Sequence, residues 1–340
     1  MFLLKNGYHL FQMLLDYRLR REVVRTRPIR LWIESSSICN LKCVMCPNKD
    51  MPAEEKTLMK LDLFKKIIDE AGTFAGDVYL HHRGEPLTNP ALFEMIAYAN
   101  AADLRVRFHT NGTLLDEARA DKLLTANPQL VSFSVDGFEK EPYERIRAGA
   151  NFETTVENIC RFATMRRARR LKHPYIVVEK IRFRNPVAPA NRDAVQAVRQ
   201  RFTDAGVDEI IEKDEYLWTQ EGNPEPAGPR TCSICTFPWY SMVICADGTV
   251  TPCPQDFQGR MKMGDVNRQG LGEIWNGPAY VDLRHKFNTN IDSLPLCHKC
   301  DRLHRKTVGG VPFQYMVTFL VDQLLGYGRL RHLMGTAERN

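Results

Sequence analysis

The chain has no long apolar run. Its 340 residues hold neither the continuous hydrophobic stretch of a membrane-spanning helix nor the apolar core of a signal peptide. Lys5, Asn6, Gly7 and His9 interrupt the apolar residues near the N-terminus. We therefore expect a cytoplasmic protein. No internal repeat or low-complexity tract is present.

A large excess of charge of one sign is also absent. The 47 Lys and Arg residues against 41 Asp and Glu residues leave a net charge of +6, which is mild for this length and at most favours an anionic substrate. Nucleic-acid binding would require a much more basic face and aromatic stacking positions, so we expect none. The basic run over residues 166–170 stands at the end of an expected helix, where cations complement the helix dipole, and we expect it to be solvated.

Disulfides are not expected either, although the chain has ten cysteines. In a reducing compartment such patterns are metal sites more often than disulfides. Cys39, Cys43 and Cys46 form a C-x3-C-x2-C loop. Three thiolates can hold a [4Fe–4S] cube and leave one iron open, whereas structural zinc needs four ligands and no fourth cysteine or histidine follows nearby. The loop therefore favours an iron–sulfur cluster with an open iron.

Residues 31 to about 212 alternate strand-like and helix-like segments, which predicts a parallel sheet. Six such units predict an α/β fold, a partial (β/α)6 TIM-like barrel with its chemistry at the C-terminal ends of the strands. The cysteine loop follows the first strand and lies on that face. The expected strands are 31–35, 77–82, 105–110, 130–135, 175–183 and 209–212, and the expected helices are 61–71, 90–102, 115–125, 152–169 and 191–205.

The rest of the chain divides around this barrel. We expect an N-terminal amphipathic basic segment over 1–30, the barrel over 31–218, a Pro/Gly-rich linker over 219–230, a small cysteine-rich module over 231–305 and a C-terminal amphipathic helix over 306–340. The terminal segments are expected to pack on the barrel or on the module. The alternative is contact with a partner or a membrane surface, where a basic amphipathic helix can lie.

Short motifs follow three further strands: His82-Arg83-Gly84-Glu85-Pro86, then Thr110-Asn111-Gly112, then Ser134-Val135-Asp136-Gly137. Asn-Gly and Asp-Gly are ordinary turn formers when they occur alone. Their order at successive strand ends, after the cysteine loop, resembles the radical S-adenosylmethionine (SAM) superfamily. That family usually has two glycines where this chain has Arg83-Gly84.

The resemblance implies the cofactor chemistry. The amine and carboxylate of SAM would chelate the open iron of the [4Fe–4S] cluster held by Cys39, Cys43 and Cys46. A reductant such as flavodoxin or ferredoxin would drive cleavage of SAM to methionine and a 5′-deoxyadenosyl radical, which abstracts hydrogen from the substrate. No residue is assigned as a catalytic acid or base. The residues implied to contact SAM are Gly84, Glu85, Pro86, Thr110, Asn111, Ser134 and Asp136.

The second cysteine set resembles the SPASM extension of this superfamily. No cysteine follows Cys300, so the chain matches the shortened "twitch" form with one auxiliary [4Fe–4S] cluster. Cys232 is an alternative to Cys235 as a ligand, and a four-cysteine zinc knuckle is the alternative to the cluster. Cys160 and Cys245 are expected to be small buried core residues. The implied ligands are Cys235, Cys253, Cys297 and Cys300.

These features predict a radical SAM enzyme acting on a small polar substrate that is sugar-like, an aminocyclitol or lipid-linked. The auxiliary cluster would accept an electron in a dehydrogenation. Maturation of a ribosomal peptide or protein is the alternative, although residues 1–30 are too few for a leader-binding domain. A non-catalytic iron–sulfur electron-transfer protein would lack the SAM-pocket motifs. Lys180 or Arg182 could face the barrel mouth, and His81-His82 are expected to pack with the second strand.

Overall fold

A computed structural model describes residues 2–183, 191–214, 235–298, 300, 303, 307–308 and 311–312. The expected linker over 219–230, the alternative ligand Cys232 and nearly all of the segment 306–340 lie outside these residues. The domain boundaries proposed above therefore stay predictions.

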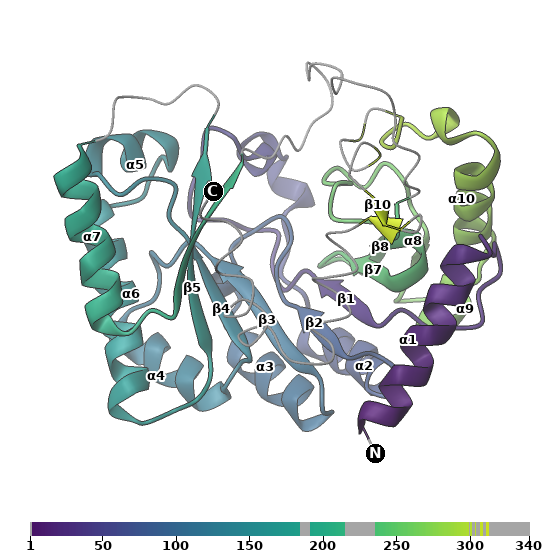
Figure 1. Ribbon diagram of the computed structural model, residues 1–340, viewed down its shortest axis with the longest axis horizontal. Coiled ribbons are helices and arrows are strands. Elements are labelled where there is room, and N and C mark those ends of the chain that lie inside the picture. The colour runs from purple at the N-terminus through teal and green to yellow at the C-terminus, as the bar shows by residue number, and fades with distance from the viewer. Residues whose placement is uncertain are drawn as a thin grey trace.

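One nine-stranded sheet organises the molecule, in the order β6-β5-β4-β3-β2-β1-β7-β8-β9 (Figure 1). The first six strands are parallel to their neighbours, and the sheet is open, as a partial barrel requires. Helices α2, α3, α4, α6 and α7 follow one another along its outer side. The six strands are β1 (Arg30–Ile33), β2 (Asp77–Tyr79), β3 (Arg105–Thr110), β4 (Leu130–Ser134), β5 (Tyr175–Arg182) and β6 (Glu209–Asp214).

The helices form where apolar residues recur at helical spacing. In α2, the buried residues Phe64, Ile67, Ile68 and Ala71 are spaced i, i+3, i+4 and i+7 and face the sheet. Helix α6 begins after Asn151, whose side chain accepts a hydrogen bond from the Thr154 amide as an N-cap. The barrel helices are α2 (Leu61–Ala71), α3 (Leu92–Ala101), α4 (Glu117–Ala126), α5 (Lys140–Ile146), α6 (Phe152–Ala168) and α7 (Arg192–Ala205).

The structure differs from the predictions most clearly in three places. Strand β2 ends at Tyr79, three residues before the predicted end. Helix α5 was not expected, because its seven residues are too few to show a helical period. The prediction that the basic run is solvated is wrong for Arg166, which is buried and donates to the carbonyls of Pro174 and Gly206.

The cysteine-rich module continues the same sheet. Strand β7 pairs in parallel with β1, so that Arg30 lies opposite Ser241 and Ile33 opposite Ile244. The predicted Asp-Gly hairpin is present between β7 and β8, with Gly248 at a φ of +96° that favours glycine. The module's elements are α8 (Phe237–Tyr240), β7 (Ser241–Ile244), β8 (Thr249–Thr251), β9 (Gly264–Asp265), α9 (Leu271–Trp275), α10 (Pro278–Thr289), β10 (Thr307–Val308) and β11 (Val311–Pro312).

Helix α1 (Phe2–Arg18) packs on this module, as predicted for the N-terminal segment. Its buried residues Leu10 and Met13 join Phe237 and Tyr240 of α8 in a small core. Figure 1 shows α1 beside α9 and α10, on the side of the molecule away from α6 and α7. Among the described helices, none is both long and apolar enough to span a bilayer.

Candidate functional site

The three cysteines of the first motif lie on one loop after β1. Each thiol lies within electrostatic range of another in the set, and burial raises the pKa of all three. The amides of Lys42 and Val44 donate to the carbonyls of Ala148 and Ile146, which holds the loop against the end of α5. Cluster binding needs thiolates, so a bound cluster has to offset the cost of ionising three buried thiols.

One buried cation stands beside the loop. The Arg147 guanidinium lies 4.0 Å from Cys43 Sγ and forms a 2.6 Å ion pair with Asp136. Asp136 also accepts a hydrogen bond from the Ile181 amide. The Asp136 side chain therefore positions Arg147 beside the cysteine loop. Sequence reasoning missed Arg147, because nothing in its neighbourhood marks it as close to a cysteine 104 residues away.

Gly84 is where the second motif crosses the cysteine loop. A Cβ atom at this position would lie 2.5 Å from the carbonyl oxygens of Ser36 and Ile38, closer than real Cβ contacts. The amide of Glu85 donates to the Ile38 carbonyl at 2.8 Å. Only glycine lets the two backbones approach this closely, and the cysteines depend on that approach for their position.

The side chain of Glu85 connects the second and third motifs. Its buried carboxylate accepts hydrogen bonds from the Leu87 amide, the Thr110 hydroxyl and the Asn111 amide. Burial raises the pKa of Glu85 in spite of these donors. The carboxylate thus fixes the backbone of both motifs.

Asn111 ties the third motif to the cysteine loop. Its side-chain Nδ2 donates to Asn40 Oδ1 at 3.0 Å, and its side-chain Oδ1 accepts from the backbone amide and the hydroxyl of Thr113. Asn40 in turn donates to the Thr113 hydroxyl at 2.8 Å. Asn40 lies inside the C-x3-C-x2-C motif and was not singled out from the sequence.

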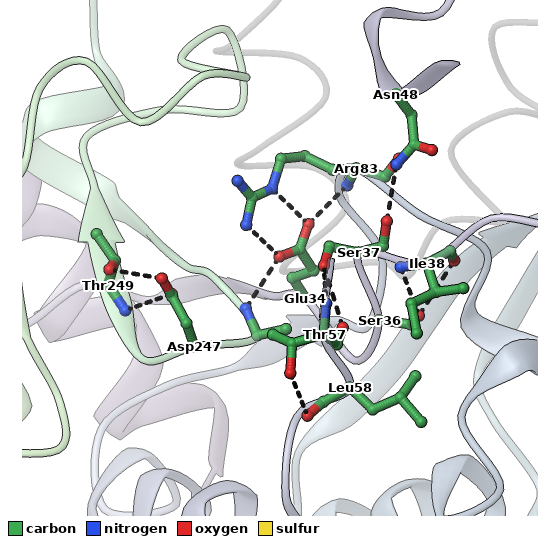
Figure 2. Close-up of polar contacts among 11 residues, drawn as sticks. Glu34, Ser36, Ser37, Ile38, Asn48, Thr57, Leu58, Arg83, Asp247 and Thr249 are labelled. Carbon is green, nitrogen blue, oxygen red and sulfur yellow. Dashed lines mark hydrogen bonds and ion pairs between the residues drawn. The ribbon is translucent and has the colours of Figure 1, made fainter. Parts of the chain in front are cut away.

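Arg83, which replaces the first glycine of the family motif, forms a buried ion pair with Glu34 (Figure 2). The guanidinium donates to the two carboxylate oxygens at 2.8 and 2.6 Å, and the Arg83 amide donates to one of them at 3.0 Å. The Ala246 amide of the module donates to the other oxygen. This pair therefore joins the ends of β1 and β2 to the β7–β8 turn, which explains why arginine stands at this position.

A polar cluster lines the inner face of the barrel. The ring of His81 stacks on that of His109 with centroids 4.2 Å apart, and His109 Nδ1 lies 3.7 Å from Glu179. Lys213 pairs with Glu179 at 2.8 Å. Burial raises the pKa of Glu179, but His109 and Lys213 outweigh it and lower the value to about 2. Glu179 stays ionised, and burial lowers the pKa of His109.

This cluster corrects the expectation for Lys180. Lys180 does not face the barrel mouth, because its ammonium lies over the Phe138 ring and near Glu212. The preceding residue, Glu179, faces inward instead, as the period of two along a strand requires. His81 and His82 lie beyond the last residue of β2, but the His81 ring packs edge-on against Tyr79 of that strand, as predicted, whereas His82 packs near Phe257.

The four predicted auxiliary ligands surround one apolar cavity. Cys235, Cys253, Cys297 and Cys300 line it together with residues such as Phe237 and Leu283. Burial raises the pKa of Cys297 well above its usual range, and the three other thiols add to the effect. Across the described ranges, no three His, Cys, Asp or Glu side chains meet as ligands of a single metal ion would. A [4Fe–4S] cluster does not need its ligands to converge on one point, because each thiolate binds a different iron of the cluster.

The other two cysteines behave differently from each other. Cys245 is buried at the end of β7, as expected. Cys160 is only half-buried, and its thiol lies 3.8 Å from the Arg201 carbonyl, so the prediction of a fully buried core residue is wrong there.

Comparison with known families decides the identity of these sites. The radical SAM superfamily matches residues 33–171, and the SPASM iron–sulfur cluster-binding domain matches residues 232–301. The chain is a radical SAM enzyme. It belongs to the branch with a SPASM domain, so it carries a SAM-binding [4Fe–4S] cluster and an auxiliary cluster. The buried cysteine loop and the four-cysteine cavity fit these two groups.

Relatives of this radical SAM enzyme have diverse functions. A cofactor-modifying protein for tungsten-containing aldehyde ferredoxin oxidoreductase from Pyrococcus furiosus is 35% identical over 79% of this chain and 86% of that protein. A SAM-dependent 2-deoxy-scyllo-inosamine dehydrogenase from Niallia circulans is 23% identical over 81% of this chain and 93% of that protein. An AdoMet-dependent heme synthase from Methanosarcina barkeri is 39% identical, but the match spans only 37% of this chain and 36% of that protein.

Solved structures support the same fold. BtrN in complex with AdoMet and 2-DOIA aligns with a TM-score of 0.53 and 21% identity, covering 80% of this chain and 92% of that chain. The anSMEcpe protein with bound AdoMet aligns with a TM-score of 0.56 and 16% identity, covering 92% and 96%. At these identities the likeness is one of fold.

Proposed function

We propose that this radical SAM enzyme oxidises an alcohol or amine carbon of a small polar substrate that is sugar-like, an aminocyclitol or lipid-linked. The observation that carries the proposal is the four-cysteine cavity of the module, which continues the barrel sheet through the β1–β7 pairing. An electron acceptor held in this way is what a two-electron oxidation needs after hydrogen-atom abstraction. The similarity to the inosamine dehydrogenase over nearly its whole length favours the same reaction class.

We further propose which residues hold the two cofactors. Cys39, Cys43 and Cys46 would bind the first cluster, and Cys235, Cys253, Cys297 and Cys300 the second. Bound SAM and its cluster supply a hydrogen-abstracting radical when reduced. The chain's part is to place the SAM amine at the backbone of Gly84-Glu85-Pro86, which the Glu85 carboxylate holds in position, and to line the pocket with Thr110, Asn111, Ser134 and Asp136.

In this proposal the inner polar cluster, which consists of His81, His109, Glu179 and Lys213, forms one wall of the substrate-binding site. Oxidation of a C–H and O–H pair to a carbonyl sends one hydrogen atom to the radical, one electron to the auxiliary cluster and one proton to a base. His109 is our candidate for that base, because burial keeps its imidazole neutral and Glu179 lies 3.7 Å from its Nδ1. Hydroxyl and amino groups of the substrate would also find hydrogen-bond partners in Glu179 and His81.

The test is anaerobic reconstitution followed by iron, sulfide and zinc analysis and an assay of reductive SAM cleavage. We expect about eight irons per chain, four for each cube. Cys297→Ala should lose about half of the iron yet still form 5′-deoxyadenosine, whereas Cys46→Ala should form none. Cys160→Ala, at a cysteine outside both sites, should match the wild type. Zinc in the second site would contradict the auxiliary cluster.

The dehydrogenation itself is tested by mass spectrometry. Aminocyclitols and sugars incubated with the reduced enzyme and SAM should lose two hydrogens in step with 5′-deoxyadenosine release. His109→Gln should still cleave SAM but should lose the oxidised product, because only the proton acceptor is removed. A peptide substrate modified under the same conditions would favour the maturase alternative instead.

A further inference from the structure

Helix α1 has an outer apolar face besides the face that packs on the module. Tyr8, Phe11 and Leu14 are 68%, 56% and 36% exposed, and Leu19 is 59% exposed. The Leu19 amide donates to the Leu15 carbonyl at 2.8 Å, so the helical geometry reaches Leu19. Tyr8, Phe11, Leu15 and Leu19 therefore lie at i, i+3, i+7 and i+11, with Leu14 at their edge. We call these five residues the outer stripe.

The outer stripe is not needed to hold the helix in place. The opposite face of α1 is anchored by Leu10 and Met13 in the core with α8, and the Tyr17 ring packs edge-on against Trp239 with centroids 5.6 Å apart. In Figure 1, α1 lies at the edge of the molecule. A contiguous apolar surface of this kind marks an interaction site more often than chance.

Unpaired cations accompany the stripe. Arg18, Arg20 and Arg25 are exposed, and none has a carboxylate within 4.0 Å among the residues that the structure describes. The two acids of this segment are occupied, because Asp16 is buried against Arg21 and Glu22 pairs with His285. An apolar and aromatic stripe with exposed arginines at the end of the same helix and just after it complements a surface of anionic lipid headgroups.

Two other partners for the outer stripe are less compatible with the positive charge of these arginines. A second copy of the chain would bring the same arginines against one another, and like charges oppose association. The chain's own residues 313–340 carry Arg329, Arg331 and Arg339 against Asp322 and Glu338, so they offer no anionic surface. The observations favour a lipid surface over both.

We propose that α1 docks this enzyme on an anionic phospholipid bilayer. The outer stripe would lie at the boundary between headgroups and acyl chains, with Arg18 and Arg20 among the headgroups. Tyrosine suits this boundary because its ring is apolar and its hydroxyl is polar. The docking does not depend on the proposed oxidation, but it would bring a lipid-linked substrate within reach of the enzyme.

Vesicle flotation of the reconstituted enzyme tests the proposal. We expect the enzyme to float with vesicles that mix phosphatidylglycerol with phosphatidylcholine and not with phosphatidylcholine alone, and to be released by salt. Phe11→Ser should weaken binding about tenfold. Arg18→Gln and Arg20→Gln should each weaken it about fivefold. The matched controls, Leu171→Ser and Arg268→Gln, change an exposed apolar residue and an exposed arginine outside this surface, and should bind like the wild type.

Three results would overturn the proposal. The first is a wild type that does not float with anionic vesicles, or stripe variants that float as well as the wild type. The second is a lower melting temperature of Phe11→Ser than of Leu171→Ser without vesicles, which would show that the chain itself covers the stripe. The third is a wild type that is dimeric by light scattering while Phe11→Ser is monomeric, which would assign the stripe to a second copy.

Discussion

Replacing Arg83 tests the buried ion pair that links the barrel to the module. In Arg83→Met the Glu34 carboxylate, whose side chain has no exposed surface, loses its two guanidinium hydrogen bonds and its countercharge. Removing one partner of a buried pair costs about 3–5 kcal/mol, because the other charge is left uncompensated. We expect a loss of this size in the free energy of unfolding, measured by anaerobic urea denaturation of the reconstituted enzyme.

The pH dependence of the effect follows from Glu34. Burial alone would raise its pKa, but Arg83 outweighs burial and lowers it. A carboxyl with a lowered pKa contributes stability that is present above its ordinary pKa near 4.3 and is lost as the pH falls through the folded value. Arg83→Met should therefore be most destabilised at neutral pH and should differ less from the wild type at acidic pH.

A double replacement separates the pair from its surroundings. In Arg83→Met/Glu34→Met the stranded charge is gone, so the loss should be smaller than the sum of the two single losses. Lys286→Met, which breaks an exposed pair with Asp282, should cost little. The reasoning is refuted if Arg83→Met unfolds at the same urea concentration as Lys286→Met, or if the single losses simply add.

Two further predictions concern the site. Gly84→Ala should displace the cysteine loop, because its Cβ would meet two carbonyl oxygens at 2.5 Å, and iron content and SAM cleavage should fall together. The control Gly7→Ala, whose Cβ would meet open space, should keep both. Equal iron in the two variants would contradict the close approach. Glu179→Gln should remove a stabilising contribution that is present above the ordinary pKa of a glutamate and lost as the pH falls toward 2, so its urea midpoint should vary less with pH than the wild type's. Parallel curves would refute this.

The parts of the site that depend on local patterns could be predicted from the sequence. The cysteine spacing and the order of motifs at strand ends need no knowledge of distant contacts, and strand β3 and helix α2 match their predicted bounds. The inner polar cluster could not be predicted, because His109 and Glu179 come from strands about 70 residues apart and become neighbours only when the sheet forms. The role of Arg83 depends in the same way on Glu34, 49 residues earlier.

The parallel pairing of β7 with β1 makes the auxiliary module a part of the barrel's architecture. Because β1 is an internal strand, a protein cut after β6 would expose one whole side of β1 as a row of unpaired backbone amides and carbonyls. Such an edge is a template for pairing with other chains. A shortened barrel intended for engineering would therefore have to cap β1 before it could stay monomeric, and an exchange of modules between relatives should keep β7 and replace only the residues C-terminal to that strand.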